Sequence, residues 1–219
     1  MSKSLAVLIL AALPLTAAAA PDPFTLDPMH SSVNFSIDHL GLTTIYGRFN
    51  KFGGKFALDT AAKAGNVEVT IDTASVDTNE NDKGSRARSR DEHLRSADFF
   101  NAAEFPRMTY KSTKVVFTGD HPATIEGTLT LLGVTKPVTL TVERFKCNPA
   151  TATAKERCGG VAVGKLKRSD FGMSRAIPSI GDEVALTVAW EANKDERRER
   201  RAGAPAEGKG ERAIAELAK

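Results

Sequence analysis

The chain has 219 residues, of which 26% are charged, and its formal net charge at pH 7 is +3. Acidic and basic residues are interleaved, so the composition offers no basic surface of the kind that binds nucleic acid. The length would allow one or two domains, but an apolar leader at the start and a charged tail at the end leave room for one sizeable core.

The first twenty residues are expected to be a secretory signal peptide. Lys3 is followed by an apolar run over residues 5–15 and then by small residues before Pro21, which is the order of a cleavable signal. The run is too short for a permanent transmembrane span. We therefore expect residues 1–20 to be removed and the protein to be periplasmic or secreted, with an uncleaved anchor as the alternative.

Residues 24–192 show short alternating segments separated by Gly, Asn, Asp and Pro, the pattern of an all-β domain of about nine or ten strands. The alternation changes phase between Phe49 and Phe52, which predicts a bulge at Gly53 or Gly54. No long helical segment is available to connect parallel strands, so the strands are expected to be antiparallel and to close into a barrel.

A short helix is expected within residues 85–96, where strand alternation is absent and charged residues dominate. Such a helix would lie at the mouth of the barrel. The aromatic pair Phe99 and Phe100, which follows it, would then point inward.

Cys147 and Cys158 are the only cysteines. An oxidising compartment permits a disulfide between them, and the absence of Cys-x-x-Cys spacing makes it a structural bond rather than a redox pair. Residues 193–219 are expected to form a charged, disordered or partly helical tail that the fold does not need; contact with an anionic membrane surface is the alternative role.

Catalytic and metal-binding motifs are incomplete. Residues 159–165 approach a phosphate-binding loop but are followed by Leu166 where a hydroxyl is required, and a strand follows instead of a helix. There is no nucleophile elbow and no His-Glu-x-x-His pair, and none of the four histidines shares a ligand-like short spacing with another. No catalytic residue, metal site or cofactor is therefore predicted.

Several stretches in chain order resemble the YceI-like family of polyisoprenoid-binding proteins. They are residues 26–35, 46–49, 89–100, 127–129, 133–138 and 168–173, including Arg-Asp-Glu-His-Leu at 90–94 and Gly-Val-Thr-Lys-Pro-Val at 133–138. The resemblance covers nearly all of residues 24–192 and implies an extended barrel of lipocalin type, with a long cavity for an isoprenoid chain. It implies nothing for residues 193–219.

Alternation together with this resemblance predicts which side chains line the cavity, with Gly47, Gly127 and Gly133 leaving space inside. A solid core with ordinary strand glycines is the alternative. The predicted lining is Phe35, Ile37, Phe49, Phe52, Phe56, Phe99, Phe100, Met108, Phe117, Gly127, Leu129 and Leu131.

A ligand head group would lie at the mouth of the barrel, where His30, Arg90, His93 and Arg95 are the candidate donors. Asp91 supports a different interpretation, in which the helix is a structural latch. The predicted function is sequestration or carriage of a polyisoprenoid lipid without catalysis; a metal- or haem-handling protein and an enzyme acting on an isoprenoid lipid are the alternatives.

Overall fold

The computed structural model describes residues 21–195 of the chain. The expected signal peptide and residues 196–219 of the tail lie outside the described residues, so both remain predictions. Within the described part, no helix has both the length and the apolar character needed to cross a membrane.

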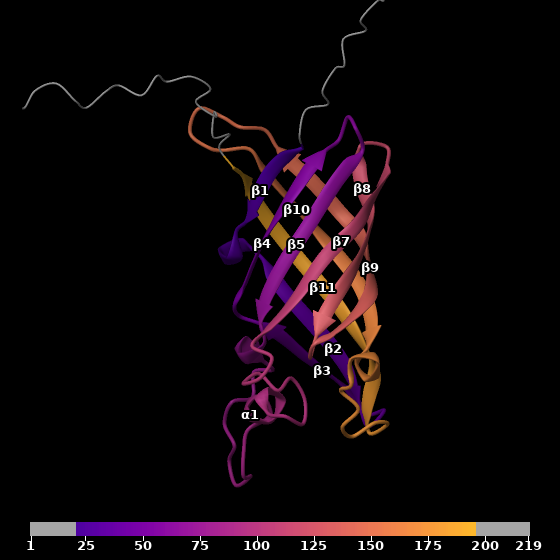
Figure 1. Ribbon diagram of the computed structural model, residues 1–219. Coiled ribbons are helices and arrows are strands. Elements are labelled where there is room, and N and C mark those ends of the chain that lie inside the picture. The colour runs from indigo at the N-terminus through magenta and orange to yellow at the C-terminus, as the bar shows by residue number, and fades with distance from the viewer. Residues whose placement is uncertain (1–20, 196–219) are drawn as a thin grey trace, which may run out of the picture.

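The described chain is mostly strand, with one short α-helix (Figure 1). The strands are β1 (Asp22–Leu26), β2 (Ser32–His39), β3 (Thr43–Phe49), β4 (Phe52–Asp59), β5 (Ala64–Asp72), β6 (Val76–Asp77), β7 (Arg107–Thr118), β8 (His121–Leu131), β9 (Val134–Asn148), β10 (Arg157–Lys167) and β11 (Ile180–Lys194). The helix α1 spans Arg90–Arg95, and the 3-10 turns are η1 (Pro28–His30), η2 (Thr73–Ser75) and η3 (Arg168–Phe171).

The strands form a closed antiparallel barrel of eight strands, which confirms the predicted fold class. The order β1-β4-β5-β7-β8-β9-β10-β11 closes because β1 also pairs with the end of β11. The start of β11 pairs with β2, and β2 pairs with β3. Strands β2 and β3 therefore extend the wall beyond β1 and β4. Figure 1 shows α1 and the β2–β3 hairpin at one end of the barrel and the β9–β10 loop at the other.

The predicted bulge at Gly53 or Gly54 is wrong. Strand β4 pairs with β5 in unbroken register from Phe52 to Asp59, and the phase change lies at residues 50–51, where β3 ends before β4 begins. Gly54 has a different role: a Cβ there would lie 2.5 Å from the carbonyl oxygen of Glu68. The glycine therefore allows a close approach between neighbouring backbones.

The last strand extends past the expected domain end at residue 192. Asn193 and Lys194 belong to β11 and pair with Thr25 and Phe24 of β1. The Nζ atom of Lys194 also lies 2.6 Å from a carboxylate oxygen of Asp22. The first residues of the predicted tail thus belong to the barrel wall.

Candidate ligand cavity

The barrel encloses one large apolar cavity of about 470 Å³. Many of the predicted residues line it: Phe35, Ile37, Phe49, Phe56, Phe99, Phe100, Met108, Leu129 and Leu131. They come from strands all around the barrel and from the segment after α1, so the alternation identified the inward face correctly along most strands. A role for these residues in binding a ligand stays a prediction.

Phe52 and Phe117 do not line the cavity, contrary to the prediction. Both are half-buried and pack against the main core cluster. Phe117 is paired with Pro122 of β8, which lines the cavity, so Phe117 lies on the predicted face of its strand. Phe52 is the first residue of β4 and Phe117 the last but one of β7, so both lie at strand ends, where their rings pack against the core without lining the cavity.

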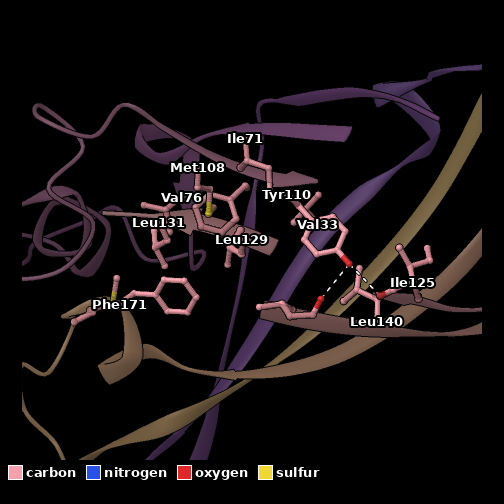
Figure 2. Packing of buried hydrophobic residues seen from close by; sticks show 14 of the residues in the cluster. Val33, Ile71, Val76, Met108, Tyr110, Ile125, Leu129, Leu131, Leu140 and Phe171 are labelled. Atoms are coloured by element: carbon pink, nitrogen blue, oxygen red, sulfur yellow. Dashed lines mark hydrogen bonds between the residues drawn. The ribbon is translucent and has the colours of Figure 1, made fainter. Parts of the chain in front are cut away.

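Gly127 does not open into the cavity either. A Cβ at this position would lie 2.6 Å from the Tyr110 ring and 2.6 Å from the carbonyl oxygen of Lys111. Tyr110 covers the glycine, and its hydroxyl lies 3.0 Å from the carbonyl oxygen of Ile125 and 3.1 Å from that of Val138 (Figure 2). Burial raises the pKa of Tyr110 to about 12.

The other two glycines expected to leave space are likewise covered by aromatic rings. A Cβ at Gly47 would lie 2.3 Å from the ring of Phe35, and one at Gly133 would lie 3.1 Å from Phe105. The expectation of empty space at these glycines was therefore wrong. The cavity exists because the inward side chains do not meet across the barrel.

Helix α1 presents one face to the cavity and the other to the segment of η2 and β6. The helix starts with a capping box, in which Ser89 accepts from the Glu92 amide and the Glu92 carboxylate accepts from the Ser89 amide. Arg90, His93 and Leu94 line the cavity. Their i, i+3, i+4 spacing places them on one face of the helix.

The opposite face of α1 is a latch, as the presence of Asp91 suggested. Asp91 is 1% exposed and accepts from the Thr78 amide at 2.9 Å and from the Thr78 hydroxyl at 2.6 Å. Arg95 donates to the carbonyl oxygens of Ala74 at 2.8 Å and Val76 at 3.0 Å. Arg95 therefore fixes the helix and does not line the cavity, contrary to its assignment as a head-group donor.

His30 is also misassigned. It lies in η1, where its Nδ1 atom is 2.9 Å from Oδ2 of Asp27, and it does not line the cavity. This contact stabilises the local turn, and the hydrogen bond from His30 is the main cause that lowers the pKa of Asp27.

Basic residues from three segments surround the open end of the cavity: the end of β2, helix α1 and the segment between β10 and β11. His39, Arg90, His93, Arg168 and Arg175 contribute to the lining, and no carboxylate does. Arg90 and Arg175 have side chains that are 37% and 58% exposed, so the cavity reaches solvent at this end. Alternation does not predict Arg168 and Arg175 as lining residues, because they lie in an irregular segment between β10 and β11 that has no periodic pattern.

The acidic side chains near this end, Asp98 and Glu80, contact histidine and arginine side chains. Asp98 lies 2.9 Å from Nε2 of His93, 2.8 Å from Arg88 and 3.5 Å from Arg175. Hydrogen bonds from His93 and then Arg88 lower the pKa of Asp98. Arg90 contacts Glu80 at 3.3 Å.

Arg168 is a buried cation at the same end, with 2% of its surface exposed. Its guanidinium donates to the carbonyl oxygens of Gly181 at 2.8 Å, Met173 at 2.9 Å and Ile180 at 2.9 Å. Burial lowers its pKa. These bonds hold the segment between β10 and β11 against the barrel.

Four aromatic rings close the other end of the cavity, and we call them the aromatic partition: Phe24, Phe56, Phe145 and Trp190. Phe24 and Phe56 stack with ring centroids 4.8 Å apart, Phe56 meets Trp190 edge-on at 5.0 Å, and Phe145 lies 6.0 Å from Trp190. Phe24 and Phe56 are almost fully buried.

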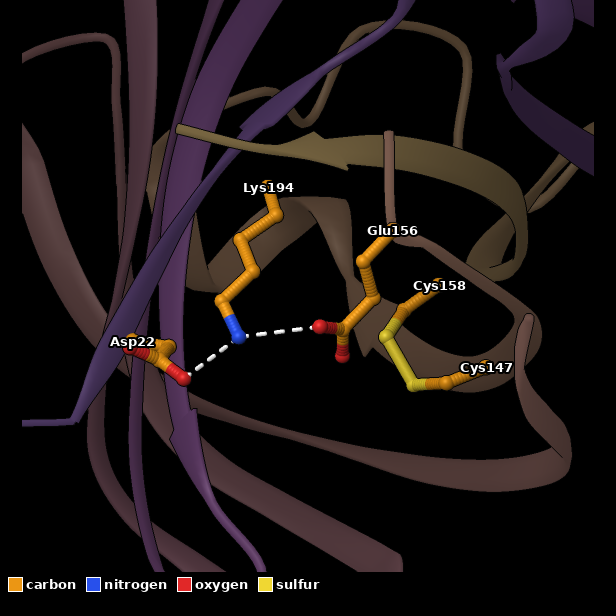
Figure 3. The surroundings of a disulfide bond; sticks show 5 residues. All are labelled: Asp22, Cys147, Glu156, Cys158 and Lys194. Carbon is orange, nitrogen blue, oxygen red and sulfur yellow. Dashed lines mark hydrogen bonds and ion pairs between the residues drawn. A yellow bond between two sulfur atoms is a disulfide. The ribbon is translucent and has the colours of Figure 1, made fainter. Parts of the chain in front are cut away.

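The predicted disulfide between Cys147 and Cys158 is present beside this partition. It joins directly opposed residues of β9 and β10. Lys194 contacts Asp22 and Glu156 close to it (Figure 3). A smaller cavity of about 230 Å³ lies here, lined by both cysteines, Phe24 and Leu58.

Among residues 21–195, no cluster of three or more histidine, cysteine or acidic side chains has an arrangement that could hold a metal ion. The cavity provides no paired carboxylates, and its basic residues are confined to the open end. The arrangement is that of a binding site with an apolar interior and a basic entrance.

Comparison with known proteins agrees with this geometry. The sequence model of the YceI-like domain matches residues 24–192. Protein YceI of Escherichia coli O6:H1 is 41% identical over 195 residues, covering 87% of this chain and 97% of the relative.

Two solved structures show the same architecture. The YCEI protein of Campylobacter jejuni is 30% identical, with a TM-score of 0.59, covering 73% of this chain and 90% of that one. A polyisoprenoid binding domain from Saccharophagus degradans is 18% identical, with a TM-score of 0.55, covering 78% of this chain and 98% of that one. At that identity the second likeness shows the fold alone.

Proposed function

Because the chain belongs to the YceI-like domain family, we propose that it is an exported protein that holds a long polyisoprenoid lipid in its barrel cavity and carries or stores it without chemical change. The observation that carries the proposal is the cavity itself. Its interior is apolar from the aromatic partition to the open end, and every ionisable group in its lining except Tyr110 is basic and lies at that end.

An apolar chain gains about 25 cal/mol for each Å² of surface that it removes from water. Because the lining of the interior is mostly apolar, a ligand needs no polar groups along its length, and a hydrocarbon of repeated units fits this requirement. Such a ligand is chosen by length and width, since few directional contacts are available to select it.

The basic entrance suits an acidic or polar head group. Arg90 and Arg175 line the cavity and are partly exposed to solvent. Both guanidinium groups can therefore donate hydrogen bonds to a phosphate or a carboxylate at the entrance. His93 also lines the cavity and is hydrogen-bonded to Asp98, which contacts Arg175 as well. These three replace the broader set of donors expected from the sequence.

The name of the Saccharophagus domain includes polyisoprenoid binding, which is consistent with the proposal but concerns a distant relative. Export is supported by the leader in residues 1–20 and by the disulfide, which persists in oxidising compartments. The proposal that the protein is not an enzyme is supported by the lining of the interior, which is mostly apolar and contains no carboxylate.

The experiment is a titration of lipid-free protein with a polyprenol and with the corresponding polyprenyl phosphate. Both should bind, and the phosphate should bind more tightly. The double variant Arg90→Gln/Arg175→Gln should lower affinity for the phosphate by about tenfold or more and leave the alcohol unaffected, because charge-assisted hydrogen bonds are worth about 1.5–3 kcal/mol.

A matched control is Lys165→Gln, which removes an exposed cation from the outer wall where it pairs with Glu183. This variant should bind both ligands like the unmodified protein. Failure of both ligands to bind, or turnover of either one, would refute the proposed function; equal loss for alcohol and phosphate would refute the head-group assignment.

A further inference from the structure

The closed end of the cavity is built from strands that are distant in the chain. Phe24 and Phe56 are direct partners on β1 and β4. Phe145 of β9 and Trp190 of β11 both lie opposite Gly160 of β10. The rings therefore extend across five neighbouring strands.

Gly160 makes this arrangement possible. A Cβ there would lie 3.0 Å from Cζ2 of Trp190 and 2.3 Å from the carbonyl oxygen of Arg144. The missing side chain gives the indole its place above the strand. Phe145 and Trp190 can then approach each other over β10.

The partition separates two spaces. Phe56 and Trp190 line the large cavity, whereas Phe24 lines the smaller one beside the disulfide. Leu58 lines both, so at that point a single side chain lies between them. Removing one ring of the partition would extend the large cavity toward the smaller one.

Strand β11 gives the depth of the large cavity, because its lining residues run from Ile180 at the open end to Trp190 at the partition. At about 3.3 Å per residue and a strand tilt of about 40°, this span corresponds to a depth of about 25 Å. An isoprenoid chain that enters at the basic end can extend only as far as the partition. The additional isoprene units of a longer chain must stay outside the cavity.

We propose that the aromatic partition determines the longest isoprenoid chain that the cavity accepts, with Trp190 and Phe56 as the residues that meet the far end of the chain. This inference rests on the proposed function and adds a specificity determinant to it. Each buried CH₂ raises affinity by about fourfold. Affinity should therefore rise by more than about tenfold with each isoprene unit until the tip reaches the partition, and then stay constant.

The test uses lipid-free full-length protein and a homologous series of linear polyprenols. Trp190 is the only tryptophan of the chain, so tryptophan fluorescence reports directly on the partition. A polyprenol carrying a nitroxide quencher at its far end should quench this fluorescence when its chain just fits. The same chain labelled beside the hydroxyl should not.

Two variants should move the length limit in opposite directions. Phe56→Ala opens the partition and should shift the plateau to longer chains. Val188→Phe places a ring on the same face of β11, one step nearer the open end, and should shift it to shorter chains; because this variant keeps the partition intact, it tests the inference even where Phe56→Ala does not fold. Leu129→Ala is the matched control, since it widens the cavity toward the open end, away from the partition, and should leave the limit unchanged.

The outcomes separate this inference from the proposed function. Binding without a plateau, the same plateau in all variants, or equal quenching by both labels would overturn the role of the partition while leaving lipid binding intact. If polyprenols of every length fail to bind, the proposed function and this inference fall together.

Discussion

Replacing Gly127 by alanine should destabilise the barrel strongly, although the change adds a single methyl group. The new Cβ would lie 2.6 Å from both Tyr110 and the carbonyl oxygen of Lys111, far inside an ordinary contact distance of about 3.5–4.0 Å. The Lys111 oxygen belongs to the neighbouring strand and cannot move alone. Tyr110 must therefore shift, and the strands β7 and β8 must separate locally.

The cost has two parts. Overpacking a filled site costs about 1–3 kcal/mol. Moving the Tyr110 hydroxyl away from Ile125 and Val138 weakens a buried hydrogen bond, which is worth about 1 kcal/mol. The free energy of unfolding should fall by about 2–4 kcal/mol, and Tm should fall by about 5–15 °C for a domain of this size.

The assay is urea and thermal unfolding followed by circular dichroism. Gly53→Ala is the matched control, because a Cβ at this strand glycine meets nothing within 4 Å and should change stability by less than about 0.5 kcal/mol. In a Tyr110→Ala background the cost of Gly127→Ala should drop, leaving the contact with Lys111. Equal stability of Gly127→Ala and the unmodified protein would show that Tyr110 does not fill the space above Gly127 and would restore an open cavity at this glycine.

Three further predictions concern the disulfide, the latch and the end of the barrel. Reducing the Cys147–Cys158 bond should lower the free energy of unfolding by about 2–3 kcal/mol, and two free thiols in denatured, unreduced protein would contradict its presence. Asp91→Ala should cost about 2–4 kcal/mol in urea unfolding, because it leaves buried donors without an acceptor; a cost below about 0.5 kcal/mol would show that the latch is unimportant. A chain ending at Ala192 should unfold about 1–3 kcal/mol more easily than one ending at Asp195, since it lacks the last pairs with β1 and the ion pairs of the strand end; identical unfolding curves would count against this.

Alternation predicted the closed antiparallel barrel because each strand has one apolar face, and closure buries it. The inward direction of Phe35 and Ile37, or of Leu129 and Leu131, follows from the sequence because the register there is unbroken. The prediction fails at Phe52 and Phe117, which lie at the ends of β4 and β7 and pack against the core without lining the cavity. Alternation gives the face on which a side chain lies, but it does not give how far the cavity extends along that strand.

The glycines show a second limit. Alternation assigns Gly127 to the inner face, but whether space remains there depends on Tyr110 of the neighbouring strand. The helix motif has a similar ambiguity: its composition indicated both a head-group site and a latch. The structure divides these roles between the two faces of α1, with Arg90 and His93 toward the cavity and Asp91 toward the segment of η2 and β6.

Whether the barrel holds a long isoprenoid lipid can be read from native mass spectrometry of protein purified from producing cells. We expect one bound molecule per chain, which solvent extraction releases as an apolar lipid with a mass series of repeated isoprene units, and no stoichiometric metal in the same sample. Protein that is recovered empty and takes up no polyprenol from lipid vesicles, or that carries a metal ion or haem instead, would contradict it.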